Sequence, residues 1–386
     1  MRIAFFISSV GDSDLALKTI KSLEHKGDNH ETFIISLTKT AQQRVEVFQS
    51  PSTVIKTTLP EILQSDKDLF PEGVCTENQL EKVELYIHSQ QIDYAYFGVP
   101  SISNEIPFQL AERLNIPVLM AYEFMFKPET HCLWKHVPIL QQKSNVQWAL
   151  PLADAHEDFQ IDDKSKIHIT GHLSIDNAYA ISPSSTRKPE EIKDILNVPT
   201  GKSLAFVSST TQPVEIDAGF LDCLLTELKH HPNMEVRLGL HPGIQNMDVY
   251  LAEILAIYKK HPDVVEQFKI ILPDNLVSRV KQPELTINAP MFQNAFLRVN
   301  VTGSEAASAA SRIAQAVPGA LLNQAVLEGK PAYSHLGKPY LPRQYFSNSI
   351  SSFFAAAPNP PRSKEDLGLD EKTTPERYAE IITIKT

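Results

Sequence analysis

Three carboxylates follow apolar runs in the first third of this chain. Asp12 and Asp14 come shortly after the run RIAFFIS, and Glu123 comes two residues after the run IPVLMA. A carboxylate in such a place can accept a proton from a hydroxyl group. Structural roles are the alternatives, because Asp12 can cap the helix that it precedes and Glu123 can be a solvated loop residue or a partner for Lys127. All three are therefore candidates for a general base.

Groups that can donate hydrogen bonds follow two apolar runs in the second half. The run SLAFVS ends at Ser208, the first of four consecutive hydroxyl residues, which continue with Ser209, Thr210 and Thr211. The run EVRLGL is followed by His241 and Pro242. Hydroxyl and imidazole groups can donate to phosphate oxygens, and proline stiffens the loop that carries the histidine. A helix cap and a structural strand-end histidine are the alternative interpretations.

Small residues mark two places where a backbone can approach an anion. Gly303 and Ser304 follow a short apolar run, and Gly319 and Ala320 open a helical stretch. Small side chains at a helix N-terminus leave backbone N–H groups accessible to a diphosphate. The two places are competing phosphate cradles.

The elements that must position these residues alternate between strand and helix. Runs that are apolar throughout predict strands in the first half at Arg2–Ser8, Glu31–Leu37, Asp93–Val99 and Ile116–Ala121. Helical spacing predicts helices at Glu77–Gln91, at Glu105–Asn115 and after a loop at Gly11–Asp14. Such an alternation indicates a parallel sheet covered on both faces.

The alternation restarts after a polar stretch rich in Pro, Ser and Lys, Ser182–Lys202. Further strands are predicted at Ser203–Ser208, Glu235–Leu240, Lys269–Leu272, Leu297–Thr302 and Pro331–Ser334. Helices are predicted at Phe220–His230, at Val249–Lys259, after Gly319 and at Thr374–Ile384. The fold class is therefore α/β, with two doubly wound parallel-sheet domains facing a central cleft, where such folds bind ligands. The predicted division is a first domain at 1–181, a linker at 182–202, a second domain at 203–360 and a tail at 361–386 that crosses back to the first domain.

Composition disfavours several classes of protein. The 386 residues include 36 Lys and Arg against 46 Asp and Glu, so the net charge of −10 argues against nucleic acid, and any anion site must be local. Three scattered cysteines and dispersed histidines do not predict a metal site. No apolar run is long enough for an integral membrane segment, and the N-terminus lacks a basic stretch before an apolar one, so a cytoplasmic protein is expected.

The common nucleotide and hydrolase motifs are absent. The chain has no GxGxxG, no GxxxxGK[ST] and no GxSxG. Any nucleotide must therefore be held in another way.

Several short segments resemble a known superfamily. NIPV at 115–118 followed by AYE at 121–123, ITGH at 169–172 and GKP at 329–331 resemble the UDP-N-acetylglucosamine 2-epimerases and the wider GT-B glycosyltransferase superfamily. This resemblance implies a fold of two Rossmann-like domains, the first on the acceptor side and the second binding the nucleotide sugar.

The resemblance also implies roles for individual residues. In the epimerases a glutamate follows the IPV strand and sits in the cleft, where Glu123 falls. GT-B transferases commonly place the acceptor-activating residue in the first domain, so Asp12 and Asp14 compete for this role. His241 and Pro242 resemble the His-Pro pair that contacts the donor nucleotide in sialyltransferases and other GT-B enzymes.

Two departures from the epimerase pattern affect the expected reaction. Ser208–Thr211 stands where the epimerases have a glycine followed by a histidine and arginines, so the catalytic histidine is absent. Asn323 and Gln324 take the place of paired glutamates that bind ribose hydroxyls, although a neutral amide can still bind them.

The leading hypothesis is a glycosyltransferase without a bound metal or separate cofactor. A UDP-sugar is the expected donor, and a small molecule, glycan or protein is the acceptor. The donor-binding candidates are Ser208, Ser209, Thr210, His241, Pro242, Gly303, Ser304, Gly319, Ala320 and Gln324. A nucleotide-sugar 2-epimerase or hydrolase and a non-catalytic nucleotide-sugar-binding protein are the alternatives, and the oligomeric state is left open.

Overall fold

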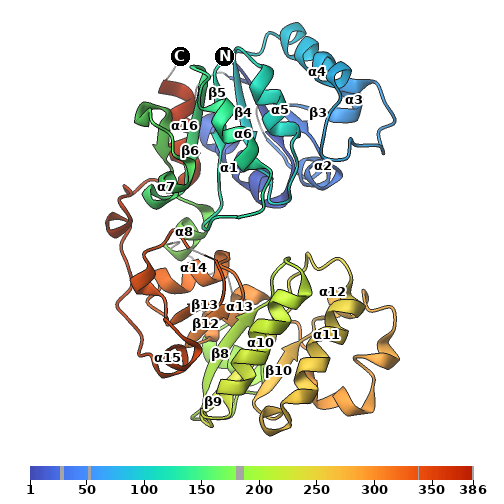
Figure 1. Cartoon of the computed structure of the whole chain (residues 1–386), viewed down its shortest axis with the longest axis vertical. Coiled ribbons are helices and arrows are strands. Elements are labelled where there is room, and N and C mark those ends of the chain that lie inside the picture. The colour runs from blue at the N-terminus through green and yellow to red at the C-terminus, as the bar shows by residue number, and fades with distance from the viewer. Residues whose placement is uncertain (27–29, 51–53, 180–186, 338, 385–386) are drawn as a thin grey trace. The chain divides into compact units, whose positions relative to one another are not determined.

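Unbroken apolar runs form two parallel sheets, each in its own part of the chain (Figure 1). The computed structural model describes residues 1–26, 30–50, 54–179, 187–337 and 339–384. Unit 1 comprises Met1–Asp176 with Lys364–Thr386, and unit 2 comprises Asn177–Ser363. The prediction of two α/β domains with parallel sheets is confirmed.

The sheet of unit 1 has seven parallel strands in the order β3-β2-β1-β4-β5-β6-β7. Its strands are β1 (Arg2–Ile7), β2 (Glu31–Ser36), β3 (Val54–Thr58), β4 (Tyr94–Gly98), β5 (Val118–Ala121), β6 (Val146–Leu150) and β7 (Ile167–Ile169). The chain starts at β1 and builds outward in both directions, so the loops after β1 and β4 diverge. This switch point is where open α/β sheets place ligands.

Helices cover the sheet of unit 1. They are α1 (Val10–His25), α2 (Lys39–Glu46), α3 (Leu59–Leu63), α4 (Glu77–Ser89), α5 (Ile106–Arg113), α6 (Leu133–Leu140), α7 (His156–Phe159) and α16 (Thr374–Ile384). Helix α8 (Leu173–Ala178) contains the division between the units, which falls after Asp176. The C-terminal helix α16 packs on α1, and its Tyr378, Ala379 and Ile382 join the core formed by β1 and α1. The last residues of the chain are thus part of unit 1.

The sheet of unit 2 has six strands in the order β11-β10-β9-β8-β12-β13, all parallel. They are β8 (Ser203–Ser208), β9 (Met234–Gly239), β10 (Phe268–Ile271), β11 (Phe296–Leu297), β12 (Arg312–Gln315) and β13 (Ala332–Ser334). The switch point lies between β8 and β12, whose last residues, Ser208 and Gln315, are register partners.

Helices also flank the sheet of unit 2. They are α9 (Pro189–Ile195), α10 (Val214–Leu228), α11 (Met247–Lys260), α12 (Asp274–Val277), α13 (Gly303–Ala309), α14 (Ala320–Leu327) and α15 (Ile350–Ala355). No helix in the part of the chain that the structure describes is both long and apolar enough to cross a membrane. Nor do the described residues include three His, Cys, Asp or Glu side chains that gather as metal ligands would.

Three expectations about elements were wrong. The residues expected to form a loop at 11–14 lie inside α1, because this helix already begins at Val10. The expected linker at 182–202 contains α9, which starts with a proline and acidic residues and buries Ile192 completely; the boundary at 181–182 itself lies outside the described residues. The strand expected at Leu297–Thr302 is only β11, since Thr302 caps α13.

Candidate functional site

Asp12 lies in the first turn of α1 and is completely buried. The backbone N–H of Ser8 donates to Oδ2 at 2.8 Å, and the N–H and Oγ of Ser9 donate to Oδ1 at 2.6 and 2.7 Å. Burial raises the pKa of Asp12 from 3.8 to about 6, although these hydrogen bonds oppose the rise. The carboxyl group of Asp12 therefore accepts hydrogen bonds from the backbone just before the helix, and it fixes the loop after β1.

Two glycines let the neighbouring strands approach this turn. A Cβ at Gly98, the last residue of β4, would lie 2.5 Å from the Cβ of Asp12. A Cβ at Gly11 would lie 2.6 Å from Oε1 of Glu123. The missing side chains thus allow Glu123, which follows β5, to reach the first turn of α1.

Glu123 is half-buried at this sheet edge. Its pKa is raised well above 4.5, first by burial and then by the negative charges of Asp12 and Asp14. Among the described residues, none donates a hydrogen bond to its carboxyl oxygens. The structure thus brings Glu123 and Asp12 together, and the carboxyl of Glu123 is the one available to a ligand.

His172 holds the backbone of Glu123. Its ring Nδ1 accepts a hydrogen bond from the N–H of Ser174 at 3.0 Å, so the proton of the neutral ring is on Nε2. The ring also forms a hydrogen bond with the backbone of Glu123. Burial lowers the pKa of His172 to about 4, so the ring is neutral at pH 7. The dispersed positions of the histidines in the sequence did not indicate this role. Its place in the segment ITGH, after a short strand, was the available signal.

Asp14 points to a different neighbour. Its carboxylate pairs with Arg44 of α2 at 2.7 Å, and more than a third of the side chain is exposed. Its charge still acts on Glu123. Of the two aspartates proposed as competing bases, one is thus committed to a loop and the other to an ion pair.

Asp12→Asn is expected to remove a pH dependence from the stability of unit 1. Between pH 3.8 and about 6 the folded state binds the proton of Asp12 more tightly than the unfolded state, so this group's contribution falls as pH rises through that window. The pKa change corresponds to about 3 kcal/mol of unfolding free energy. Both tryptophans, Trp134 and Trp148, lie in unit 1, so their fluorescence in urea reports this unit. A difference between parent and variant that stays constant from pH 4 to pH 7 would contradict the prediction.

In unit 2 the hydroxyl run after β8 is fixed by a buried acid. Asp217 of α10 accepts from the N–H of Thr210 at 2.9 Å, from its Oγ1 at 3.1 Å and from the hydroxyl of Tyr250 at 2.8 Å. Ser208 donates to the carbonyl of Ser209 at 3.2 Å. These hydroxyls therefore shape the loop. Sequence reasoning missed both Asp217 and Tyr250, because each resembles an ordinary helix residue.

His241 follows β9 and is oriented by backbone groups. Its N–H donates to Oγ of Ser209 at 2.6 Å, and its ring Nδ1 accepts from the N–H of Gly243 at 2.9 Å. A Cβ at Gly243 would lie 2.9 Å from that ring nitrogen. The carbonyl of Pro242 accepts from Arg279 at 2.5 Å, which braces the loop. Desolvation of the ring lowers the pKa of His241, although the residue as a whole is exposed. The neutral ring therefore presents Nε2–H as a donor.

Buried amides surround the N-terminus of α14. Gln315 ends β12, and a Cβ at Gly319, which caps α14, would lie 2.8 Å from its Oε1. This oxygen and both amide atoms of the fully buried Asn323 have no hydrogen-bond partner among the described residues. Gln324 donates to Glu328 at 2.8 Å, while Ala320 is exposed. A buried polar atom without a partner costs about 1–3 kcal/mol, so this end of α14 suits a polar ligand.

The competing phosphate cradle at Gly303 and Ser304 lies in the first turn of α13, where Thr302 and Glu305 already bond to the backbone. Thr302 caps α13 by accepting from the N–H of Glu305 at 3.2 Å, and Glu305 accepts from the N–H of Thr302 at 2.9 Å. The helix has only seven residues. Because a carboxylate already occupies this first turn, α14 is the better anion site.

Comparison with known proteins identified solved structures that share this fold. Neither protein-family models nor curated proteins matched the sequence. A UDP-GlcNAc 2-epimerase from Methanocaldococcus jannaschii, in complex with UDP-GlcNAc and UDP, matches the structure over 100% of both chains, with a TM-score of 0.57 and 11% identity. The S. aureus MnaA structure with UDP covers 98% of this chain and 90% of its own, with a TM-score of 0.55 and 10% identity. A glycosyltransferase from Rickettsia africae covers 98% and 91%, with a TM-score of 0.51 and 13% identity.

The similar structures include UDP-GlcNAc 2-epimerases and a glycosyltransferase, which are the groups that the sequence motifs resemble. At these identities the likeness establishes the fold alone. This chain has a GT-B type fold.

Proposed function

We propose that this chain acts on a nucleotide sugar, with the nucleoside diphosphate bound by unit 2 and the acceptor by unit 1. The observation that carries the proposal is the N-terminus of α14, where buried amide atoms of Gln315 and Asn323 have no partner among the described residues. Nδ2 of Asn323 can donate to a phosphate oxygen, whereas the two amide oxygens can accept from a hydroxyl of the ribose or the sugar. Backbone N–H groups there favour an anion, and the missing side chain of Gly319 lets the amide of Gln315 lie against this helix end. This amide lies at the β8–β12 switch point, where doubly wound sheets bind ligands.

The reaction that suits these residues best is glycosyl transfer. The bond between the sugar and the diphosphate breaks, and the α14 N–H groups with Nε2–H of His241 stabilise the charge left on the diphosphate. The acceptor hydroxyl forms the new bond to the sugar and gives its proton to Glu123. This chemistry uses no separate cofactor or metal ion. A UDP-sugar is the first donor to test, because two of the similar structures contain UDP.

A 2-epimerase is the second candidate, since several of the similar structures are UDP-GlcNAc 2-epimerases. Glu123 suits either reaction. The hydroxyl run Ser208–Thr211 favours transfer, because it lacks the histidine that the epimerase pattern has at this place.

Product analysis separates the hypotheses. The protein is incubated with UDP-, GDP- and CMP-sugars, with and without hydroxyl acceptors, and the nucleotides and sugars are resolved by chromatography. Free nucleotide (UDP or GDP, or CMP from a CMP-sugar) together with a glycosylated acceptor supports transfer. A donor with an inverted C2 supports epimerisation. Nucleotide binding without either product supports a non-catalytic binding protein, and no binding at all contradicts the proposal.

Gly319→Ala is expected to weaken UDP binding by about 10-fold, because the new methyl group would meet the buried amide of Gln315 and crowd the helix end. The φ of Gly319 is −140°, so the substitution introduces no backbone strain. Gly219→Ala is the matched control, since a Cβ there meets no atom within 4 Å. Isothermal titration calorimetry compares the two, and equal losses of affinity would contradict the α14 site.

A further inference from the structure

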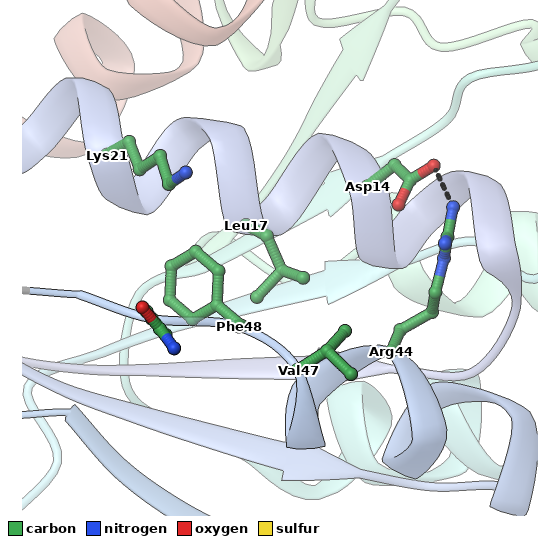
Figure 2. A pocket seen from close by; sticks show the side chains of 7 residues that line it. Asp14, Leu17, Lys21, Arg44, Val47 and Phe48 are labelled. Atoms are coloured by element: carbon green, nitrogen blue, oxygen red, sulfur yellow. Dashed lines mark hydrogen bonds and ion pairs between the residues drawn. The ribbon is translucent and has the colours of Figure 1, made fainter.

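A pocket of about 320 Å³ lies between α1 and the end of α2 in unit 1 (Figure 2). It is lined by Asp14, Leu17, Lys21, Arg44, Val47, Phe48 and Gln49. The three α1 residues recur at helical spacing and therefore share one face of the helix. The pocket belongs to neither the sheet edge with Glu123 nor the α14 cradle.

The floor of the pocket is apolar and its rim is cationic. Leu17 and Phe48 are almost completely buried, whereas Val47 is 76% exposed. Nζ of Lys21 lies 5.6 Å from the centroid of the Phe48 ring, a cation–π distance. Figure 2 shows Arg44 joined to Asp14 at the other end of the pocket. One apolar surface thus lies between two cations.

The charge of this rim differs from that of the whole chain. Two cations, Lys21 and Arg44, face a single carboxylate, Asp14, while the chain as a whole carries −10. No carboxylate among the described residues lies within 4 Å of Nζ of Lys21. Lys56 does not line the pocket, but its Nζ lies 5.8 Å from the same Phe48 centroid and adds to the positive charge nearby. The pocket is therefore a local site of positive charge, as an anion site in an acidic protein must be.

We propose that this pocket binds a small organic anion, a phosphate or carboxylate attached to an apolar group. The anion contacts Lys21 and Arg44, and the apolar group packs on Leu17, Val47 and Phe48. Arg44 suits this role because its planar guanidinium retains donors after pairing with Asp14. The pocket volume is at the lower end of the range for small-molecule sites, so the ligand is compact.

The test is a calorimetric titration of the full chain with phenyl phosphate, benzoate, inorganic phosphate and phenol. Phenyl phosphate or benzoate, or both, should bind with a Kd of about 1 mM or tighter, and inorganic phosphate and phenol at least about 10-fold more weakly. The two organic anions distinguish a phosphate ligand from a carboxylate ligand. Inorganic phosphate that binds as tightly as phenyl phosphate would overturn the proposal, and so would the absence of binding by both organic anions at about 10 mM.

Variants locate the binding. Lys21→Gln and Arg44→Gln should each weaken binding by about 10-fold, because each removes one of the two cations that meet the anion. Lys39→Gln is the matched control on α2, since Lys39 is exposed and lies 3.7 Å from Asp68. Gly319→Ala should leave binding unchanged and thus separates this pocket from the α14 cradle. Circular dichroism melting checks that each variant is folded. Equal losses in Lys39→Gln and Lys21→Gln, or a loss in Gly319→Ala, would overturn the proposal.

Discussion

Glu123→Gln is expected to lower the turnover rate by about 10²–10⁴-fold and to leave nucleotide affinity nearly unchanged. Glutamine keeps the shape of the side chain beside Gly11 but cannot accept a proton. The raised pKa also sets the sign of the pH dependence, because a base must be ionised to act. Activity should therefore rise with pH through an acid limb well above pH 4.5. Steady-state kinetics across pH measures both effects.

Asp14→Asn is the matched control for this prediction. The charge of Asp14 raises the pKa of Glu123, so removing it should move the acid limb to lower pH and preserve turnover. Asp12→Asn should move the limb in the same direction. If either aspartate variant abolishes turnover while Glu123→Gln retains it, the base has been assigned to the wrong residue.

His241→Ala is expected to lower kcat/KM by about 10- to 100-fold, which corresponds to a loss of roughly 1.5–3 kcal/mol for a hydrogen bond to a charged group. The bond from Gly243 holds Nδ1, so Nε2–H is the donor that the substitution removes. Unlike Glu123→Gln, this variant should weaken nucleotide binding and transition-state stabilisation together.

His230→Ala is the control for the histidine substitution. His230 is exposed and follows the C-terminus of α10, at the opposite end of that helix from the hydroxyl run. Its loss should leave kcat/KM within about twofold of the parent. Equal effects of the two substitutions would contradict a specific role for His241.

The sequence predicted strands such as β1 well, because an unbroken apolar run indicates a buried strand without any information on distant residues. The run Arg2–Ile7 is apolar in every position but the first, and Ile3–Ile7 are completely buried in β1. Strand β12 was missed because it carries Arg312 and Gln315. The guanidinium of Arg312 is buried and donates to the carbonyl of Phe353 at 2.6 Å and to that of Phe354. Carbonyl groups far along the chain thus satisfy the buried guanidinium, and the sequence around β12 does not indicate this contact.

The candidate site was predictable only in part for the same reason. Glu123 and His241 stand at strand ends, which the alternation of strands and helices reveals. The roles of Asp217 and His172 depend on partners such as Thr210 and the backbone of Glu123, which the spacing of residues does not disclose. The same applies to Gln315, since its amide meets Gly319 only once β12 is recognised as a strand.

The central claim is that the N-terminus of α14 binds a nucleoside diphosphate. The most direct measurement is an isothermal calorimetric titration of the full chain with UDP, GDP and CDP. We expect saturable binding of at least one of them, UDP first, with a Kd below about 1 mM, and weaker binding in Gly319→Ala than in Gly219→Ala. Absence of binding by all three at millimolar concentration, with the chain folded, would contradict it.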